Sequence, residues 1–359
     1  MSLWHWINSK IWQNRFGQVV EDAGSASGAA PRRAVHVVVM DGTLSSLEPG
    51  FETNAGLAYQ LLKRSAGPGV ILHYQPGLQF DRSNFLASAW SVLTGNGLDW
   101  QIQKVYGALA SRYQLGDEIF LIGYSRGAFA ARSLAGLIDR VGLLRRDQAT
   151  QRHVSMAYRH YRDGSDALRV FAKEYCHLDV PITAIGVWDT VKALGLRVPG
   201  LWRMFEGKYQ FHNHQISACV GAGFQALALD ETRDTYRPEM WEDPPDRPVA
   251  LQQVWFVGNH GDVGGQVMGS PQTRPLSNIP FVWMMQRLQE QGLPLPKAWT
   301  EEFVQDVHAP STGNWSGLNW VFWARSRRLV GRFRSESIHP SVADGRPGRL
   351  INLHNDAGG

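Results

Sequence analysis

Residues 119–138 read IFLIGYSRGAFAARSLAGLI. Residues 119–122 are apolar and favour a β-strand, whereas residues 128–138 combine strong helix formers with small residues and favour a helix. Gly123, Ser125 and Gly127 lie between the two. A Gly-x-Ser-x-Gly sequence between a strand and a helix places a serine on a sharp, strained turn where its hydroxyl can act as a nucleophile. The stretch therefore predicts a strand, a turn that presents Ser125, and a helix.

On both sides of this stretch, short apolar runs predict further buried strands, and helical patterns separate them. The predicted strands are 33–40, 70–74, 119–122, 182–187 and 252–257; the predicted helices are 53–65, 101–113, 128–138 and a polar stretch over 147–175. This alternation is typical of a parallel sheet with helices on both faces. We predict an α/β fold of the α/β-hydrolase type, with a mostly parallel central sheet. Aromatic-rich insertions around 190–250 and 297–335 are expected to form a cap or lid.

Composition limits the class of protein. The chain has 359 residues, 43% hydrophobic and 19% charged, which is typical of a globular protein and not of a disordered one. Its formal net charge is only +4, so no nucleic-acid partner is expected. Two cysteines cannot build a disulfide framework.

The sequence also bears on the location of the protein. No apolar run reaches 18 residues, and the N-terminus lacks the pattern of a signal peptide. The expected location is therefore cytoplasmic, or outside the cell if a specialised secretion system exports the chain.

The expected organisation has three parts. Residues 1–32 are predicted to form an amphipathic helix followed by a linker of small residues. Residues 33–345 are predicted to form a single α/β-hydrolase domain, and residues 346–359 a tail.

A serine nucleophile needs a base, and the base needs an acid that orients it. Asp189 and His260 each follow one of the apolar strands that come after the serine turn. The order Ser125, Asp189, His260 is the order found in α/β-hydrolases. We therefore predict that these three residues are the catalytic triad.

Other residues could take these roles. His339 is the alternative base, although it follows no clear strand, and Asp262 is the alternative acid, although its position favours a role in shaping the His260 loop. A metal site formed by Asp41, Asp189, His260 and Asp262 is disfavoured because no H-x-H or H-E-x-x-H spacing supports it. We predict neither a metal nor a cofactor.

Stabilisation of an oxyanion requires backbone N–H donors that are already in place. The first expected donor is the amide of Arg126, directly after the nucleophile. The second is expected from the loop after the first predicted strand, at Gly42 or Thr43.

Several segments together resemble one family, the α/β-hydrolases of the type VI secretion phospholipase effectors and their bacterial and fungal relatives. The matching segments are MDGT (40–43), GYSRGA (123–128), GVWDTV (186–191), ALALDETR (226–233), VWFVGNHGDVGG (254–265) and IHPSV (338–342). The resemblance implies an esterase or phospholipase whose Ser–Asp–His triad is Ser125, Asp189 and His260. An immunity protein or a delivery protein would then be a candidate partner.

A cationic run near the C-terminus suggests contact with lipid. Tryptophans precede it, and it contains no acidic residue. The aromatic residues are Trp315, Trp320, Phe322 and Trp323; the arginines are Arg325, Arg327, Arg328, Arg332 and Arg334. Such a surface suits peripheral contact with an anionic membrane. The alternative is that these residues pack on the protein's own sheet.

The favoured function is hydrolysis of carboxylic esters, with phospholipid acyl esters as the leading substrate. Two alternatives stay open at this point: a soluble hydrolase of small esters or peptides, and a non-catalytic α/β scaffold that binds a protein or a membrane.

Overall fold

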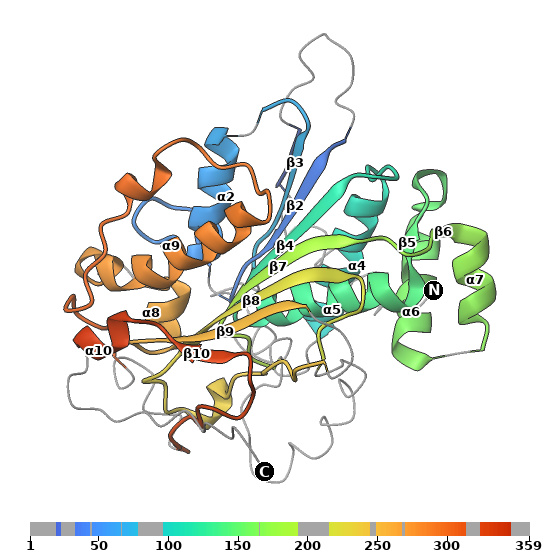
Figure 1. Ribbon diagram of the computed structural model, residues 1–359. Helices are drawn as coiled ribbons and strands as arrows, with labels where there is room; N and C mark the ends of the chain where they lie inside the picture. Colours follow the sequence, from blue (N-terminus) through green and yellow to red (C-terminus); the bar gives the residue numbers. More distant parts are fainter. Residues whose placement is uncertain are drawn as a thin grey trace, which may run out of the picture.

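An eight-stranded sheet runs through the protein (Figure 1). The computed structural model describes residues 19–22, 33–43, 45–65, 67–77, 96–164, 166–192, 215–244, 249–267, 270–313 and 324–345. Within these ranges the strand order is β1-β3-β2-β4-β7-β8-β9-β10. All neighbours from β3 to β10 are parallel, and only β1 pairs antiparallel, with β3. The predicted α/β fold with a mostly parallel central sheet is confirmed.

The elements have the following bounds. The sheet strands are β1 (Val19–Asp22), β2 (Val35–Met40), β3 (Val70–Gln75), β4 (Glu118–Tyr124), β7 (Ile182–Trp188), β8 (Val220–Ala228), β9 (Ala250–Phe256) and β10 (Glu336–Ile338). The helices are α2 (Asn54–Ser65), α4 (Asn96–Ala110), α5 (Arg126–Val141), α6 (Gln151–Asp163), α7 (Leu168–Tyr175), α8 (His260–Gly264), α9 (Arg274–Glu290) and α10 (Ser341–Gly345). A small pair, β5 (Leu143–Leu144) with β6 (Cys176–His177), and the short 3-10 helix η5 (Asp234–Tyr236) complete the elements used below.

Helices cover both faces of the sheet, as predicted (Figure 1). Along β2, Val37 and Val39 belong to the core shared with α2 and α9, whereas Val38 and Met40 belong to the core shared with α4, α5 and α6. This alternation follows from the two-residue repeat of a strand. Because both faces are buried, the strand sequence is a continuous apolar run and not an alternating one.

The structure differs from the sequence prediction at three strands. β8 lies between β7 and β9 inside the segment 190–250, which the pattern predicts to be an irregular insertion. Its sequence, VGAGFQALA, is rich in small residues that do not favour a strand by themselves. β1 begins within the predicted N-terminal helix and ends within the predicted linker, and β10 directly precedes His339, where no strand was expected.

Several sequence predictions concern residues outside those that the structure describes. Residues 1–18, which carry most of the predicted amphipathic helix, lie outside the described residues, as do 193–214 and 314–323, which carry much of the predicted lid. The domain boundaries at residues 33 and 345 and the lid therefore stay predictions.

The first turn of α5 packs directly on the carboxyl end of β2. A methyl group at Gly127 would lie 2.1 Å from the carbonyl oxygen of Met40 and 2.5 Å from that of Asp41. These distances are too short for any side chain, and both atoms belong to the backbone, so they cannot rotate away. Gly127 is therefore required for β2 and α5 to approach one another.

Gly127→Ala is expected to lower the free energy of unfolding by about 3 kcal/mol, because the added carbon overlaps backbone atoms. Urea denaturation followed by circular dichroism measures the change. Gly67→Ala is the matched control: no atom lies within 4 Å of its added carbon, so its stability should change by less than about 1 kcal/mol. Equal stability of the two variants would contradict the role given to Gly127.

Candidate active site

Ser125 occupies a strained turn between β4 and α5. Its φ and ψ angles are 57° and −120°, a conformation that costs a non-glycine residue about 1–3 kcal/mol. The turn is held by hydrogen bonds: the Ser125 N–H donates to the Trp188 carbonyl oxygen at 2.9 Å, and the Ser125 carbonyl oxygen accepts from the N–H of Phe129 at 3.2 Å. A methyl group at Gly123 would lie 2.7 Å from the Cα atom of Ala128, so glycine is required before the serine as well.

The structure brings Ser125, His260 and Asp189 together at the carboxyl edge of the sheet. Ser125 follows β4, Asp189 follows β7, and His260 begins α8 shortly after β9. The distance from His260 Nε2 to Ser125 Oγ is 2.9 Å, and the distance from His260 Nδ1 to Asp189 Oδ2 is 2.6 Å. All three side chains are buried. With Nδ1–H donating to the carboxylate, Nε2 is left with a lone pair that can accept the serine proton.

Asp189 is an ionised carboxylate despite its complete burial. Its backbone adopts a φ angle of 41°, and its N–H donates to the Ala226 carbonyl oxygen at 2.8 Å. Its Oδ1 atom accepts from the N–H of Ala228 at 3.1 Å, and the guanidinium of Arg328 donates to both carboxylate oxygens. Burial by itself would raise the pKa of Asp189, but the charge of Arg328 and the hydrogen bonds from His260 and Arg328 outweigh burial and lower that pKa.

Arg328 corrects one sequence prediction. It belongs to the cationic run expected to face an anionic membrane, but its side chain is only 5% exposed because it reaches inward to Asp189. Arg325 is half-buried and donates to the hydroxyl of Thr232 at 3.0 Å. The exposed arginines of the run are Arg327, Arg332 and Arg334. The tryptophans of the predicted surface lie outside the described residues.

The loop that carries His260 is fixed by the cap of α8. The Asn259 side-chain oxygen accepts from the N–H groups of Gly261 at 2.8 Å and Asp262 at 3.1 Å. In return, Asp262 accepts from the N–H of Asn259 at 2.9 Å. This reciprocal arrangement is a capping box, and it sets the position of His260 at the first residue of the helix.

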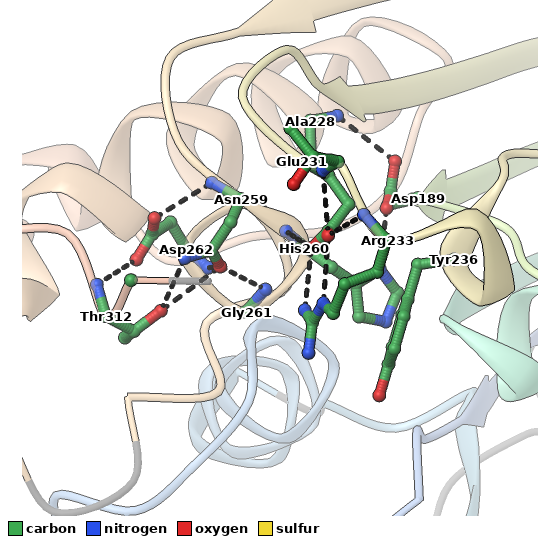
Figure 2. A network of polar contacts seen from close by, with 12 residues as sticks. Asp189, Ala228, Glu231, Arg233, Tyr236, Asn259, His260, Gly261, Asp262 and Thr312 are labelled. Carbon is green, nitrogen blue, oxygen red and sulfur yellow. Dashed lines mark hydrogen bonds and ion pairs between the residues drawn. The ribbon is translucent and has the colours of Figure 1, made fainter. Parts of the chain in front are cut away.

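Asp262 also holds a second segment against this loop. Its carboxylate accepts from the N–H of Thr312 at 2.7 Å (Figure 2). It also accepts from the Ser311 hydroxyl at 2.5 Å. These bonds leave Asp262 as the residue that shapes the loop, while Asp189 bonds to the ring of His260.

Tyr124 connects three loops of the site. A methyl group at Gly42 would lie 2.6 Å from the Tyr124 ring, and one at Gly264 would lie 1.8 Å from it, so the ring is packed between two glycines. The ring also lies against the His260 ring, with centroids 5.0 Å apart, and the Tyr124 hydroxyl donates to the His260 carbonyl oxygen at 3.2 Å. The residue before Ser125 thus fixes the distance between the early loop and the His260 loop.

A buried ion pair lies on the other side of His260. The ring of Tyr236 contacts the His260 ring, with centroids 4.7 Å apart, and the Arg233 guanidinium lies 3.9 Å from the Tyr236 ring (Figure 2). Glu231 pairs with Arg233 at 2.6 Å and accepts from the His260 N–H at 3.2 Å. Burial opposes ionisation of Glu231, but Arg233 outweighs it and lowers the pKa of Glu231.

The sequence prediction missed most of these supporting residues. Glu231 and Arg233 lie in the segment 226–233 that carries the family resemblance. The resemblance marked this segment as part of the family pattern, but it did not indicate that these two residues pair beside His260. Tyr124 lies inside the serine motif, at a position that the motif leaves unspecified. Arg328 had no signal at all, because its sequence neighbours are surface arginines.

The early loop lies beside the nucleophile, since a methyl group at Gly42 would lie 3.4 Å from Ser125 Cβ. The N–H of Gly42 donates to Asp41 Oδ1 at 2.6 Å and is therefore already occupied. Asp41 also accepts from the hydroxyls of Thr53 and Tyr74, each at 2.7 Å. Burial raises the pKa of Asp41 to about 6, in spite of these three donors.

Within the described parts of the chain, the Arg126 N–H and the Thr43 hydroxyl have no such partner. Arg126 is the first residue of α5, and the first N–H groups of a helix have no partner within the helix. The hydroxyl oxygen of Thr43 is buried without a hydrogen-bond partner among the described residues.

His339, the alternative base, lies elsewhere. It follows the edge strand β10, its Nδ1 atom is 2.8 Å from the Ser341 hydroxyl, and its ring stacks on Phe256 with centroids 4.6 Å apart. Burial lowers the pKa of His339. The ring that contacts Ser125 is that of His260.

The carboxylates considered for a metal site have other partners. Asp41 and Asp262 bond to hydroxyl and backbone N–H groups, and Asp189 bonds to His260 and Arg328. No group of three or more His, Cys, Asp or Glu side chains with a metal-binding arrangement occurs in the described parts of the chain. Nor does any helix in those parts have the length and apolarity needed to span a bilayer.

Comparison with known proteins identifies the family. Residues 35–287 match the family described as "T6SS, Phospholipase effector Tle1-like, catalytic domain", which is most of the chain. The chain belongs to this family. The resemblance read from the motifs is thereby confirmed, and membership of this Tle1-like family supports a lipase- or esterase-like hydrolase.

The individual relatives share at most 29% sequence identity with this Tle1-like chain. An uncharacterized protein of Saccharomyces cerevisiae, YEL023C, is 29% identical over 188 residues, which is 45% of this chain and 27% of the yeast protein. An uncharacterized protein from Pseudomonas aeruginosa has a crystal structure with a TM-score of 0.45 and 16% identity, over 77% of this chain and 49% of that one. The Tle1 effector, solved bound to the VgrG spike, gives a TM-score of 0.39 and 16% identity, over 70% of this chain and 57% of that one. The chain thus spans about a quarter to three fifths of these relatives.

Asp262→Ala is expected to lower the free energy of unfolding by about 2–4 kcal/mol, because the N–H groups of Asn259 and Thr312 lose their partner. Chemical denaturation measures this loss. Asp306→Ala is the control, since Asp306 is exposed and its carboxylate accepts from the exposed N–H of His308; its stability should change by less than about 0.5 kcal/mol. A stable Asp262→Ala protein would show that the cap does not hold the loop.

Proposed function

We propose that this chain is a serine hydrolase that cleaves carboxylic esters, with lipid acyl esters as its substrate class. The observation that carries the proposal is the unbroken chain of hydrogen bonds from Ser125 Oγ through the His260 ring to the Asp189 carboxylate. Each residue has the chemistry that acyl transfer needs: a nucleophile, a base and an acid that orients the base. The strained backbone at Ser125 and the burial of all three side chains support the same role.

In the proposed reaction, Ser125 Oγ attacks the ester carbonyl carbon while its proton passes to His260 Nε2. The carbonyl π electrons move to the oxygen, and a tetrahedral intermediate forms. As the intermediate collapses, His260 returns the proton to the departing alcohol oxygen, which leaves an acyl-serine. A water molecule then attacks the acyl carbon, with His260 again accepting the proton. As this second intermediate collapses, the bond between the acyl carbon and Ser125 Oγ breaks, and His260 returns its proton to Oγ. The carboxylic acid is released and the Ser125 hydroxyl is restored.

The negative charge on the intermediate needs donors that are already in place. We assign the Arg126 N–H as the first donor. Because the Gly42 N–H is bonded to Asp41, we assign the second to Thr43, through its N–H or its hydroxyl. Asp41 then serves to hold the loop in the conformation that turns the Gly42 N–H away from the reaction.

The lipid substrate is proposed from membership of a phospholipase effector family. A delivery protein, an immunity protein, export and contact with an anionic membrane are proposed on the same basis. The exposed Arg327, Arg332 and Arg334 would serve that membrane contact.

Replacement of Ser125 by alanine should abolish labelling by a fluorophosphonate probe and hydrolysis of both a short soluble ester and vesicles of mixed bacterial phospholipids. Asp189→Asn and His260→Ala should lower turnover by about three powers of ten or more, because the three residues act as a unit. His339→Ala, which removes a histidine outside the site, should keep full activity. Labelling of folded Ser125→Ala protein would overturn the proposal, and product analysis of the vesicles identifies the ester bond cleaved.

Thr43→Val should lower kcat about 10- to 100-fold with little change in KM if its hydroxyl contacts the oxyanion, since that contact strengthens only in the transition state. Valine keeps the shape of threonine and removes only the hydroxyl. Steady-state kinetics on a soluble ester measures the change. An unchanged kcat would assign the second donor to the Thr43 backbone N–H, which this variant retains.

A further inference from the structure

Arg328 is a buried cation that shares the Asp189 carboxylate with His260. We infer that Arg328 is a positioning residue of this site, which fixes the carboxylate of Asp189 and extends to lower pH the range in which His260 can act as a base. The inference rests on the proposed function, in which Asp189 orients the base.

The guanidinium of Arg328 makes four hydrogen bonds. Nη1 donates to Asp189 Oδ1 at 2.5 Å and to the Ala228 carbonyl oxygen at 2.8 Å. Nη2 donates to Asp189 Oδ2 at 2.8 Å and to the Tyr236 carbonyl oxygen at 2.6 Å. Two parallel bonds to one carboxylate fix its plane, which a single bond from a lysine could not do. Asp189 Oδ2 therefore accepts from both Arg328 and His260, and the position of the cation determines where the imidazole lies.

The backbone around Arg328 is attached to the site. The N–H of Ser326 donates to the Thr232 carbonyl oxygen at 2.8 Å, and the Ala324 carbonyl oxygen accepts from the N–H of Asp234 at 3.0 Å. These bonds join residues 324–326 to the segment that also carries Arg233 and Tyr236. Residue 328 lies beyond the stretch 35–287 that matches the family, so this contact is supplied from outside the matched segment.

The charge of Arg328 bears directly on the protonation of His260. The groups that face His260 or its immediate partners are Asp189 after β7, Ser125 and Arg126 at the start of α5, Tyr124 on β4, Glu231 and Arg233 after β8, Tyr236 on η5, and Asp262 on α8 itself. Glu231 is already balanced by Arg233. Without Arg328, Asp189 would be a buried carboxylate with no cation except a protonated His260. The Asp189–His260 pair would then hold a proton to higher pH, whichever residue carries it.

The test compares Arg328→Gln and Arg328→Lys with the native protein. For Arg328→Gln, we expect the maximal kcat/KM on a soluble ester to fall about 10- to 100-fold. The acid limb of its pH profile should move upward by about one pH unit, since an adjacent cation shifts a titration by this order. Arg328→Lys should keep the acid limb close to its native position, because it keeps the charge, but should still lose kcat because the two-bond geometry is gone. Arg169→Gln removes the same charge from an exposed side chain on α7 and should change neither quantity.

A second readout needs no turnover. Titration of the His260 ring, followed by nitrogen NMR of labelled protein, should show the same upward movement in Arg328→Gln and none in Arg169→Gln. If Arg328→Gln lost activity only in parallel with its melting temperature, with both pH midpoints unchanged, Arg328 would be merely structural and the inference would be wrong. If the native protein hydrolysed no ester while the His260 titration still moved, the proposed function would fail and the electrostatic role of Arg328 would stand.

Discussion

The backbone contact between the first turn of α5 and the end of β2 is the constraint on which the site depends. At Gly127 the two elements approach to a distance that no side chain allows, and at Gly123 an added methyl group would lie 2.7 Å from the same helix turn. The chain between these glycines has too little room for a relaxed turn, so Ser125 adopts its left-handed conformation. Its hydroxyl is thereby directed out of the sheet edge at which β7 and β9 also end. The strain is local, and the packing of the two cores on either side of the sheet sustains it.

Much of this could be predicted because the deciding signals are local. Five consecutive residues specify the serine turn, and the apolar runs before Asp189 and His260 place those residues at strand ends. The parallel sheet with helices on both faces follows from the alternation of strands and helices, and the structure agrees with it. The contacts of Ser125, His260 and Asp189 agree with the expected arrangement, while their roles stay proposals.

The remaining features depend on contacts that a linear pattern does not carry. β8 is composed largely of small residues and becomes a strand because its neighbours β7 and β9 require one between them. Helix α9 is buried on nearly every side and contains Pro280, so it shows no amphipathic period. In the early loop, the sequence could not show that the Asp41 carboxylate occupies the Gly42 N–H. In the sequence, Arg328 cannot be distinguished from an exposed arginine, because its partner Asp189 lies 139 residues away along the chain.

That separation has a consequence for how the protein is made. Protein synthesis proceeds from the N-terminus at about 5–20 residues per second, so Asp189 emerges from the ribosome roughly ten seconds before Arg328 does. During this interval the sheet strands up to β9 can assemble, but the Asp189 carboxylate has no guanidinium partner. Burial of an unpaired carboxylate costs several kcal/mol, which disfavours closing the site early. The nascent chain is thereby biased towards an open site until the segment that carries Arg328 has been synthesised.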